Sequence, residues 1–119
     1  MTMLDCPRLY PLKLLGRKWS YLVLRVLRQR GSLSFSRLKD ELHFATNRTI
    51  SAELRYLADE SLVVHASDGT YTLTPAGKGL VEAVDSLHRW SVEHKKIGAC
   101  PGSMQCSRCS RYEDVIQLR

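Results

Sequence analysis

Hydrophobic residues recur along most of the chain at the three- and four-residue intervals of amphipathic helices. Within residues 18–30 they are Trp19, Leu22, Val23, Val26 and Leu27. The same spacing predicts further helices over residues 7–15, 35–42, 47–60 and 75–95. The periodicity therefore predicts a chain made mainly of short helices.

Residues 61–75 have the pattern of a β-hairpin that leads into a helix. Two β-prone runs, 63–67 and 70–73, flank Asp68-Gly69, a dipeptide typical of tight turns in which both central residues have positive φ. Thr74-Pro75 suits the start of the last helix. The segment 32–34 is expected to be an extended link.

Four helices, a hairpin and a final helix make up the element order of a winged helix-turn-helix domain. We therefore expect a mainly α fold with a small β-hairpin over residues 1–97, followed by a cysteine-containing tail over residues 98–119. In such a domain the second helix of the helix-turn-helix pair lies in the major groove of DNA. Here that helix covers residues 47–60 and is capped by Thr46.

The face of this helix opposite Ile50, Leu54 and Leu57 is polar and cationic. The residues that we expect to contact DNA are Thr46, Asn47, Arg48, Thr49, Ser51, Ala52 and Arg55. Arginine pairs with guanine, asparagine pairs with adenine and an alanine methyl packs on thymine, so the set suits base reading. The backbone N–H groups of Thr46 to Thr49 are expected to be free for a phosphate oxygen. The alternative is an ordinary amphipathic helix whose polar face contacts only solvent.

The hairpin is a weaker candidate for DNA contact. It contains neither lysine nor arginine, so it is a poor probe of the minor groove. We expect it to contribute little, through the backbone N–H groups of Gly69 and Thr70.

Charge narrows the class of partner. The chain has 119 residues and a formal net charge of +6, and residues 1–31 carry the whole surplus. A basic protein attracts polyanions, of which double-stranded DNA fits the predicted fold best. Candidates for contacts with backbone phosphates are Arg17, Lys18, Arg25 and Arg28.

Other function classes lack support in the sequence. No apolar run is long enough to span a bilayer and no apolar secretory stretch begins the chain, so we expect a cytoplasmic protein with no membrane partner. Paired carboxylates, a nucleophile with its base and a glycine-rich phosphate loop are all missing from the sequence, so we expect no enzymatic activity.

The cysteines suggest a second chemistry. Cys100, Cys106 and Cys109 in the tail suit a zinc site in which Cys6 or His94 is the fourth ligand. The alternatives are an iron–sulfur cluster, a Cys106–Cys109 disulfide and free thiols.

Cys6 is also a candidate redox site on its own. It precedes the first helix, where the helix dipole and Arg8 favour the reactive thiolate form. The alternative is that Cys6 is simply a small buried hydrophobic side chain.

Several sequence motifs occur together and in a characteristic order. They are Cys6-Pro7, Leu14-Leu15-Gly16-Arg17-Lys18-Trp19-Ser20, Leu24-Arg25, Phe35-Ser36-Arg37-Leu38-Lys39, Ile50-Ser51-Ala52-Glu53-Leu54-Arg55-Tyr56-Leu57 and Tyr71-Thr72-Leu73-Thr74-Pro75-Ala76-Gly77. With this combination, residues 6–90 resemble the HxlR-type transcriptional regulators of the MarR-like winged-helix group.

The resemblance implies a sequence-specific transcriptional regulator that binds a pseudo-palindromic operator as a homodimer, with the first and last helices at the dimer contact. The base-reading segment of the family corresponds here to Thr46, Asn47, Arg48, Ser51 and Arg55. Its N-terminal cysteine, which senses electrophiles or oxidants in some members, corresponds to Cys6. The hairpin is shorter than in the family, and the cysteine-bearing tail is not part of the common pattern. An alternative function is a metal- or redox-binding protein-interaction module on the same scaffold.

Overall fold

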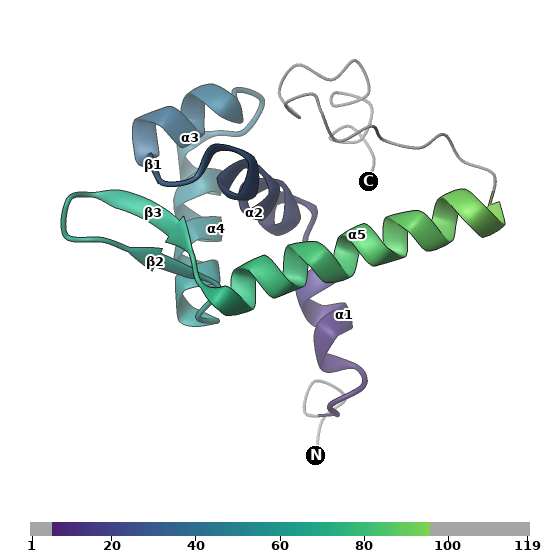
Figure 1. Cartoon of the computed structure of the whole chain (residues 1–119). Helices are drawn as coiled ribbons and strands as arrows, with labels where there is room; N and C mark the ends of the chain where they lie inside the picture. The colour runs from purple at the N-terminus through teal and green to yellow at the C-terminus, as the bar shows by residue number, and fades with distance from the viewer. Residues whose placement is uncertain (1–5, 96–119) are drawn as a thin grey trace.

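The computed structural model describes residues 6–95, except for the side chain of Lys18. Its elements are α1 (Tyr10–Leu15), α2 (Lys18–Arg30), β1 (Leu33–Ser34), α3 (Phe35–Glu41), α4 (Asn47–Asp59), β2 (Val63–His65), β3 (Thr70–Leu73) and α5 (Pro75–Lys95) (Figure 1). This order confirms the mainly α, winged helix-turn-helix fold. Within the described residues, no helix combines the length and the apolar character needed to cross a membrane. The expected tail over residues 98–119 lies outside the described residues.

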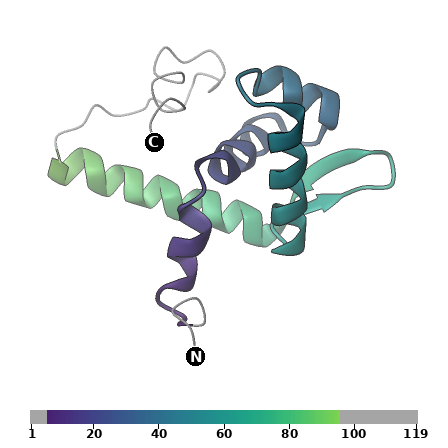
Figure 2. The ribbon, with the colours of Figure 1, turned by 180° about the vertical axis from the view of Figure 1, so that it is seen from behind.

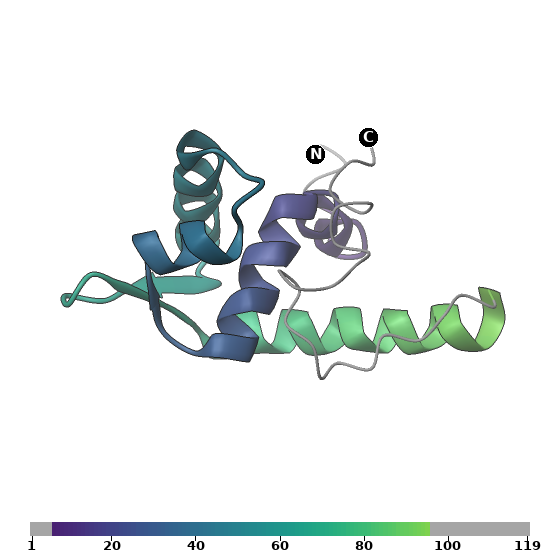
Figure 3. The same cartoon turned by 90° about the horizontal axis from the view of Figure 1, so that it is seen from above.

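Helix α2 is the centre of the fold. It buries Leu22, Val23, Leu24, Val26 and Leu27, and the other helices and β3 pack around it. Viewed from above, α3 and α4 lie on one side of α2 while α5 runs beneath it and extends well beyond the core (Figure 3). The predicted helical stripe of residues 18–30 is thus the main hydrophobic surface of the domain.

A three-stranded antiparallel sheet flanks the helices, in the order β1-β3-β2. The hairpin strands pair Val63 with Leu73, and β1 pairs Leu33 with Tyr71. The interpretation of residues 32–34 as a simple link was therefore incomplete. The segment is a strand because β3 offers it a free edge, which is a tertiary contact that a local pattern does not reveal.

The first helix begins at Tyr10, and the prediction that it begins at Pro7 was wrong. The carbonyl oxygen of Cys6 accepts hydrogen bonds from the N–H groups of Leu9 (3.0 Å) and Tyr10 (2.9 Å), which makes a turn before the helix. Pro11 then falls within the first helical positions, where its missing N–H group has no intrahelical role.

The hairpin is confirmed, but its turn differs from the expected type. Gly69 has φ 90°, whereas among the described non-glycine residues only Ser61 has a positive φ. The N–H of Gly69 donates to Ala66 (3.0 Å) and the N–H of Ala66 donates to Thr70 (2.8 Å). These bonds describe a three-residue loop that ends in a left-handed glycine, a common hairpin loop in which Asp68 needs no positive φ.

A compact junction joins the end of α4 to the start of α5. The N–H groups of Ser61 and Leu62 donate to the carbonyls of Ala58 (3.0 Å) and Leu57 (2.9 Å), which ends α4 with Ser61 in the left-handed region at φ 59°. Thr74 Oγ1 donates to the Ser61 carbonyl (2.7 Å) and accepts from the N–H of Gly77 (3.1 Å).

This junction explains a glycine within α5. A Cβ atom added at Gly77 would lie 2.2 Å from the carbonyl oxygen of Leu62, which is closer than real Cβ contacts allow. A Cβ atom at the exposed Gly79 would meet nothing within 4 Å. Gly77 therefore allows α5 to contact the backbone of Leu62, whereas Gly79 only lowers the helix propensity of α5.

We expect Gly77→Ala to lower the free energy of unfolding by about 2–3 kcal/mol, because the backbone of the junction must shift to accept a methyl group. Gly79→Ala is the matched control and should raise it by about 0.5–1 kcal/mol through helix propensity. Urea unfolding followed by circular dichroism measures both. Equal effects of the two substitutions would contradict this account of the junction.

Candidate nucleic-acid interface

The N-terminus of α4 is capped as the sequence predicts. Thr46 has an extended backbone (φ −76°, ψ 160°), and its hydroxyl oxygen accepts a hydrogen bond from the N–H of Thr49 at 3.1 Å. The expectation that the N–H groups of Thr46 to Thr49 are all free is therefore wrong for Thr49. Those of Asn47 and Arg48 are the remaining first-turn donors of the helix.

Helix α4 has one buried face and one exposed face. Ile50, Glu53, Leu54 and Leu57 are buried. The exposed residues at the N-terminal end and along the outer face are Thr46, Asn47, Arg48, Ser51, Ala52 and Arg55, while Thr49 is half-buried. Seen from behind, α4 stands in front of the domain with the hairpin beside it (Figure 2). The structure thus brings the residues predicted to read bases together on one open surface.

Charge is not distributed as the sequence suggested. Arg17, Arg25 and Arg28, which we expected at phosphates, form ion pairs with Glu53 (2.8 Å), Asp85 (3.3 Å) and Glu82 (3.9 Å). The N-terminal surplus of cations is therefore partly neutralised by acids of α4 and α5.

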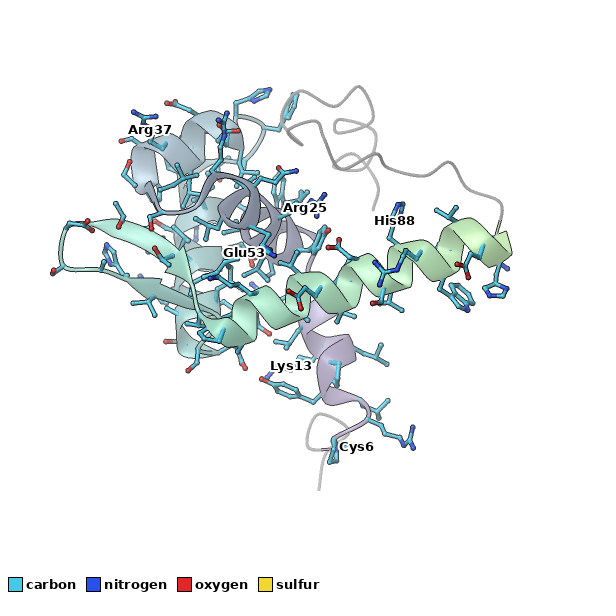
Figure 4. All side chains as sticks on the ribbon, viewed as in Figure 1. Cys6, Lys13, Arg25, Arg37, Glu53 and His88 are labelled. Carbon is cyan, nitrogen blue, oxygen red and sulfur yellow. The ribbon has the colours of Figure 1, made fainter. Side chains whose placement is uncertain are left out.

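The exposed face of α4 keeps its cations free. Neither Arg48 nor Arg55 has an ion-pair partner within residues 6–95, and both side chains are exposed. Arg37 of α3 projects outward at the same end of the molecule (Figure 4). An approaching polyanion therefore meets unneutralised positive charge on α4.

Glu53 is a buried carboxylate that the sequence pattern did not single out. Its side chain is buried on the inner face of α4, where Arg17 Nη2 lies 2.8 Å from Oε1 and the hydroxyl of Ser20 donates to Oε2. The Arg17 guanidinium also stacks over the ring of Tyr56 at 4.0 Å. The available signal was its spacing, because Glu53 falls in register with Ile50 and Leu57 on the apolar stripe.

A second carboxylate contact lies at the C-terminal end of α4. Glu60 accepts a hydrogen bond from the hydroxyl of Tyr10 and forms an ion pair with Lys13 at 3.4 Å, both from α1. The Tyr10 hydrogen bond, with help from Lys13, lowers the pKa of Glu60, and the same hydrogen bond raises the pKa of Tyr10. The end of α4 is thus joined to α1 by an ionised carboxylate.

The hairpin offers less to DNA than the sequence suggested. The N–H of Gly69 donates to Ala66, and the N–H and hydroxyl of Thr70 donate to Asp68 Oδ1 at 3.0 and 2.7 Å. Both backbone N–H groups that we expected at DNA therefore have partners within the turn, and their contact with DNA stays a prediction. The Thr70 hydroxyl, followed by its N–H, lowers the pKa of Asp68, so the tip keeps a negative charge that phosphates repel.

The cysteine predictions can be followed only in part. Cys6 is a free, half-buried cysteine beside the start of α1 (Figure 4). Cys100, Cys106 and Cys109 lie outside the described residues, so the zinc site stays a prediction. Of its proposed further ligands, His94 is in the last turn of α5, whereas Cys6 precedes α1 (Figure 4). Residues 6–95 contain no His, Cys, Asp and Glu cluster suited to a metal ion.

The capped helix with its open cationic face, supported by α2 and α3 and followed by a hairpin, defines the chain as a winged helix-turn-helix DNA-binding protein. Residues 14–98 match the family model described as HxlR-like helix-turn-helix. The chain therefore belongs to the HxlR family of transcriptional regulators.

Curated relatives agree with this family. MalR of Fusobacterium mortiferum, named as a regulatory protein, is 28% identical over 95 residues, which are 75% of this chain and 90% of MalR. YdzF of Bacillus subtilis strain 168, named as an uncharacterised HTH-type transcriptional regulator, is 28% identical over 95 residues, which are 74% of this chain and 86% of YdzF.

Solved structures agree with the fold. The reduced form of the transcriptional regulator YodB from B. subtilis superimposes with a TM-score of 0.68 at 22% identity, covering 78% of this chain and 97% of YodB. The quinone-bound form of YodB gives a TM-score of 0.67 at 24% identity, covering 74% of this chain and 99% of that chain.

Proposed function

We propose that this regulator binds a pseudo-palindromic operator as a homodimer and reads it with α4. The observation that carries the proposal is the pair of exposed arginines, Arg48 and Arg55, which lack ion-pair partners within residues 6–95 although other cations around α2 have them. A helix with one fully packed face and an opposite face of unpaired arginines is suited to the major groove.

The outer face of α4 supplies several kinds of base contact. Arg48 and Arg55 would pair with guanine edges, Asn47 with adenine, and the methyl group of Ala52 would pack on thymine. Ser51 would contact a base edge or a phosphate, and the first-turn N–H groups of α4 would contact a phosphate. Two such helices in a two-fold dimer enter successive major grooves about 34 Å apart.

Exposed apolar side chains support the proposed dimer. Leu87 and Trp90 of α5 are 50% and 53% exposed, and Leu12 of α1 is 61% exposed. Within α5 the buried residues are Gly77 and Val81, both near its beginning, so the later turns have little packing within the described part of the chain. A second copy would bury this surface, as the family resemblance implies.

We further propose that Cys6 links the chemical state of the cell to DNA binding. Cys6 is free and half-buried, and its carbonyl oxygen accepts the hydrogen bonds of the turn that leads into α1. Covalent modification of this thiol would therefore occur directly before α1, a helix that we propose for the dimer contact. The quinone-bound form of YodB supports an electrophile as the ligand class.

We expect Arg48→Ala to weaken binding to an operator selected from a random DNA library by about 1–3 kcal/mol and to leave folding unchanged. Lys78→Ala, which removes the same charge from the first turns of α5, away from Leu87 and Trp90, is the matched control and should have little effect. Fluorescence anisotropy across a salt series measures both. Affinity that hardly changes with salt would contradict phosphate neutralisation as a driving force.

We expect Leu87→Ala to weaken the dimer by about tenfold, because the substitution removes apolar surface that the leucine would bury on association. Val64→Ala is the control, since Val64 is 51% exposed but lies on the hairpin. Sedimentation equilibrium gives both dissociation constants. A monomeric wild-type protein, or equal effects of the two substitutions, would refute the proposed interface.

We expect N-ethylmaleimide to change operator affinity of the wild-type protein by about fivefold or more, within the usual range of coupling between sites. Cys6→Ser should abolish this response and keep the affinity of the untreated protein. A response that persists in Cys6→Ser would assign the effect to another cysteine.

A further inference from the structure

Helix α4 is attached to the α1–α2 corner through two carboxylates. Glu53 and Glu60 are two helical turns apart and lie on the same side of α4. Glu53 accepts hydrogen bonds from Arg17 and Ser20 at the start of α2. Glu60 accepts a hydrogen bond from Tyr10 and forms an ion pair with Lys13, both of α1. Figure 4 labels one residue of each contact, Glu53 and Lys13, and shows α1 extending away from the core. We call the contact of Glu60 with Tyr10 and Lys13 the α1 clasp.

Apolar packing anchors α4 at both ends, whereas the contacts of Glu60 with α1 are polar. Near its N-terminus the helix packs through Ile50 against the shared core, and Lys39 of α3 donates to the carbonyl of Ala45 in the preceding turn. Near its C-terminus Leu57 packs in the same core, and Glu60 adds polar contacts with Tyr10 and Lys13 of α1. Within α1 the buried residue is Leu14, so apolar packing gives α1 little independent hold on the domain.

We propose that the α1 clasp makes Glu60 and Tyr10 positioning residues that set the angle between the recognition helix and the dimer-forming α1. This inference rests on the proposed function, because the angle matters only in a dimer on DNA. In a two-fold dimer, any change of this angle moves both recognition helices symmetrically and so changes the distance between them. The α1 clasp therefore determines how strictly the protein selects the spacing of its two half-sites.

The geometry separates this role from simple support of the fold. Tyr10 is 37% exposed, and the side chains of Lys13 and Glu60 are 32% and 20% exposed, so each polar group of the α1 clasp still reaches water when the clasp is lost. Glu53, in contrast, is buried and its loss would disturb the core. Loss of the α1 clasp can thus change the geometry of the dimer while the domain stays folded.

The test uses the full-length protein and the operator that wild type selects from a random DNA library. Spacer variants of this operator are lengthened or shortened by one and two base pairs. We expect wild type to lose affinity by about tenfold or more on each altered spacer, because each step rotates one half-site relative to the other. Tyr10→Phe, which keeps the charge of the protein, and Glu60→Gln should lose only about threefold or less.

Asp59→Asn is the matched control. Asp59 is exposed, adjoins Glu60 and has no ion-pair partner within residues 6–95, so its substitution removes the same charge from the same end of α4 without breaking the α1 clasp. It should keep the wild-type spacing preference. If Asp59→Asn relaxes the preference as strongly as Glu60→Gln, charge and not the clasp is responsible, and the inference is overturned.

Two further outcomes are decisive. Wild-type spacing profiles in both Tyr10→Phe and Glu60→Gln would overturn this inference and leave the proposed function standing. Failure of wild type to select any operator would overturn the proposed function and this inference with it. Hydrogen exchange adds a measurement without DNA, since amides in the last turn of α4 should exchange faster in both clasp variants than in Asp59→Asn.

Discussion

Burial of one face of α4 is the constraint on which the rest of the structure depends. Ile50, Leu54 and Leu57 are at most 2% exposed, and each such side chain contributes about 1.5–3 kcal/mol when it leaves water. This packing fixes the rotation of α4 about its own axis. Because helical positions repeat every 3.6 residues, the same rotation turns Arg48 and Arg55 outward. The outward position of both arginines is therefore a consequence of how the core is filled.

Ion pairing then decides which cations are available to a polyanion. The formal charge of +6 is concentrated at the N-terminal end of the sequence, yet Arg17, Arg25 and Arg28 lie beside acids contributed by later helices. Within residues 6–95, Arg48 and Arg55 of α4 lack such partners, although this helix has as many acidic residues as basic ones. Net charge correctly indicated the class of partner, but the location of the binding surface depends on tertiary neighbours.

The sequence predicted the long periodic elements well, because their hydrophobic spacing reflects the core directly. Helix α2 was predicted over residues 18–30, and Thr46 was correctly identified as the cap of α4. Strand β1 was missed since its two residues become a strand only by pairing with β3. Glu53 was missed because a charged residue on an apolar stripe becomes interpretable only when Arg17 and Ser20 are seen around it. Local patterns identify the buried face of a helix. A short paired strand or a buried charge can be predicted only when its partner, distant in sequence, is known.

The two arms of the domain differ from its centre in what stabilises them. From α2 to the beginning of α5, apolar side chains form one continuous core. Helix α5 then continues to Lys95 with no buried residue after Val81 among those described, and α1 buries only Leu14. A helix gains most of its stability from packing of an apolar face, so arms with exposed Leu12, Leu87 and Trp90 are better suited to association than to isolation. One copy of the chain is thus sufficient to shape α4, whereas in the proposed dimer the arms would decide the distance between two such helices.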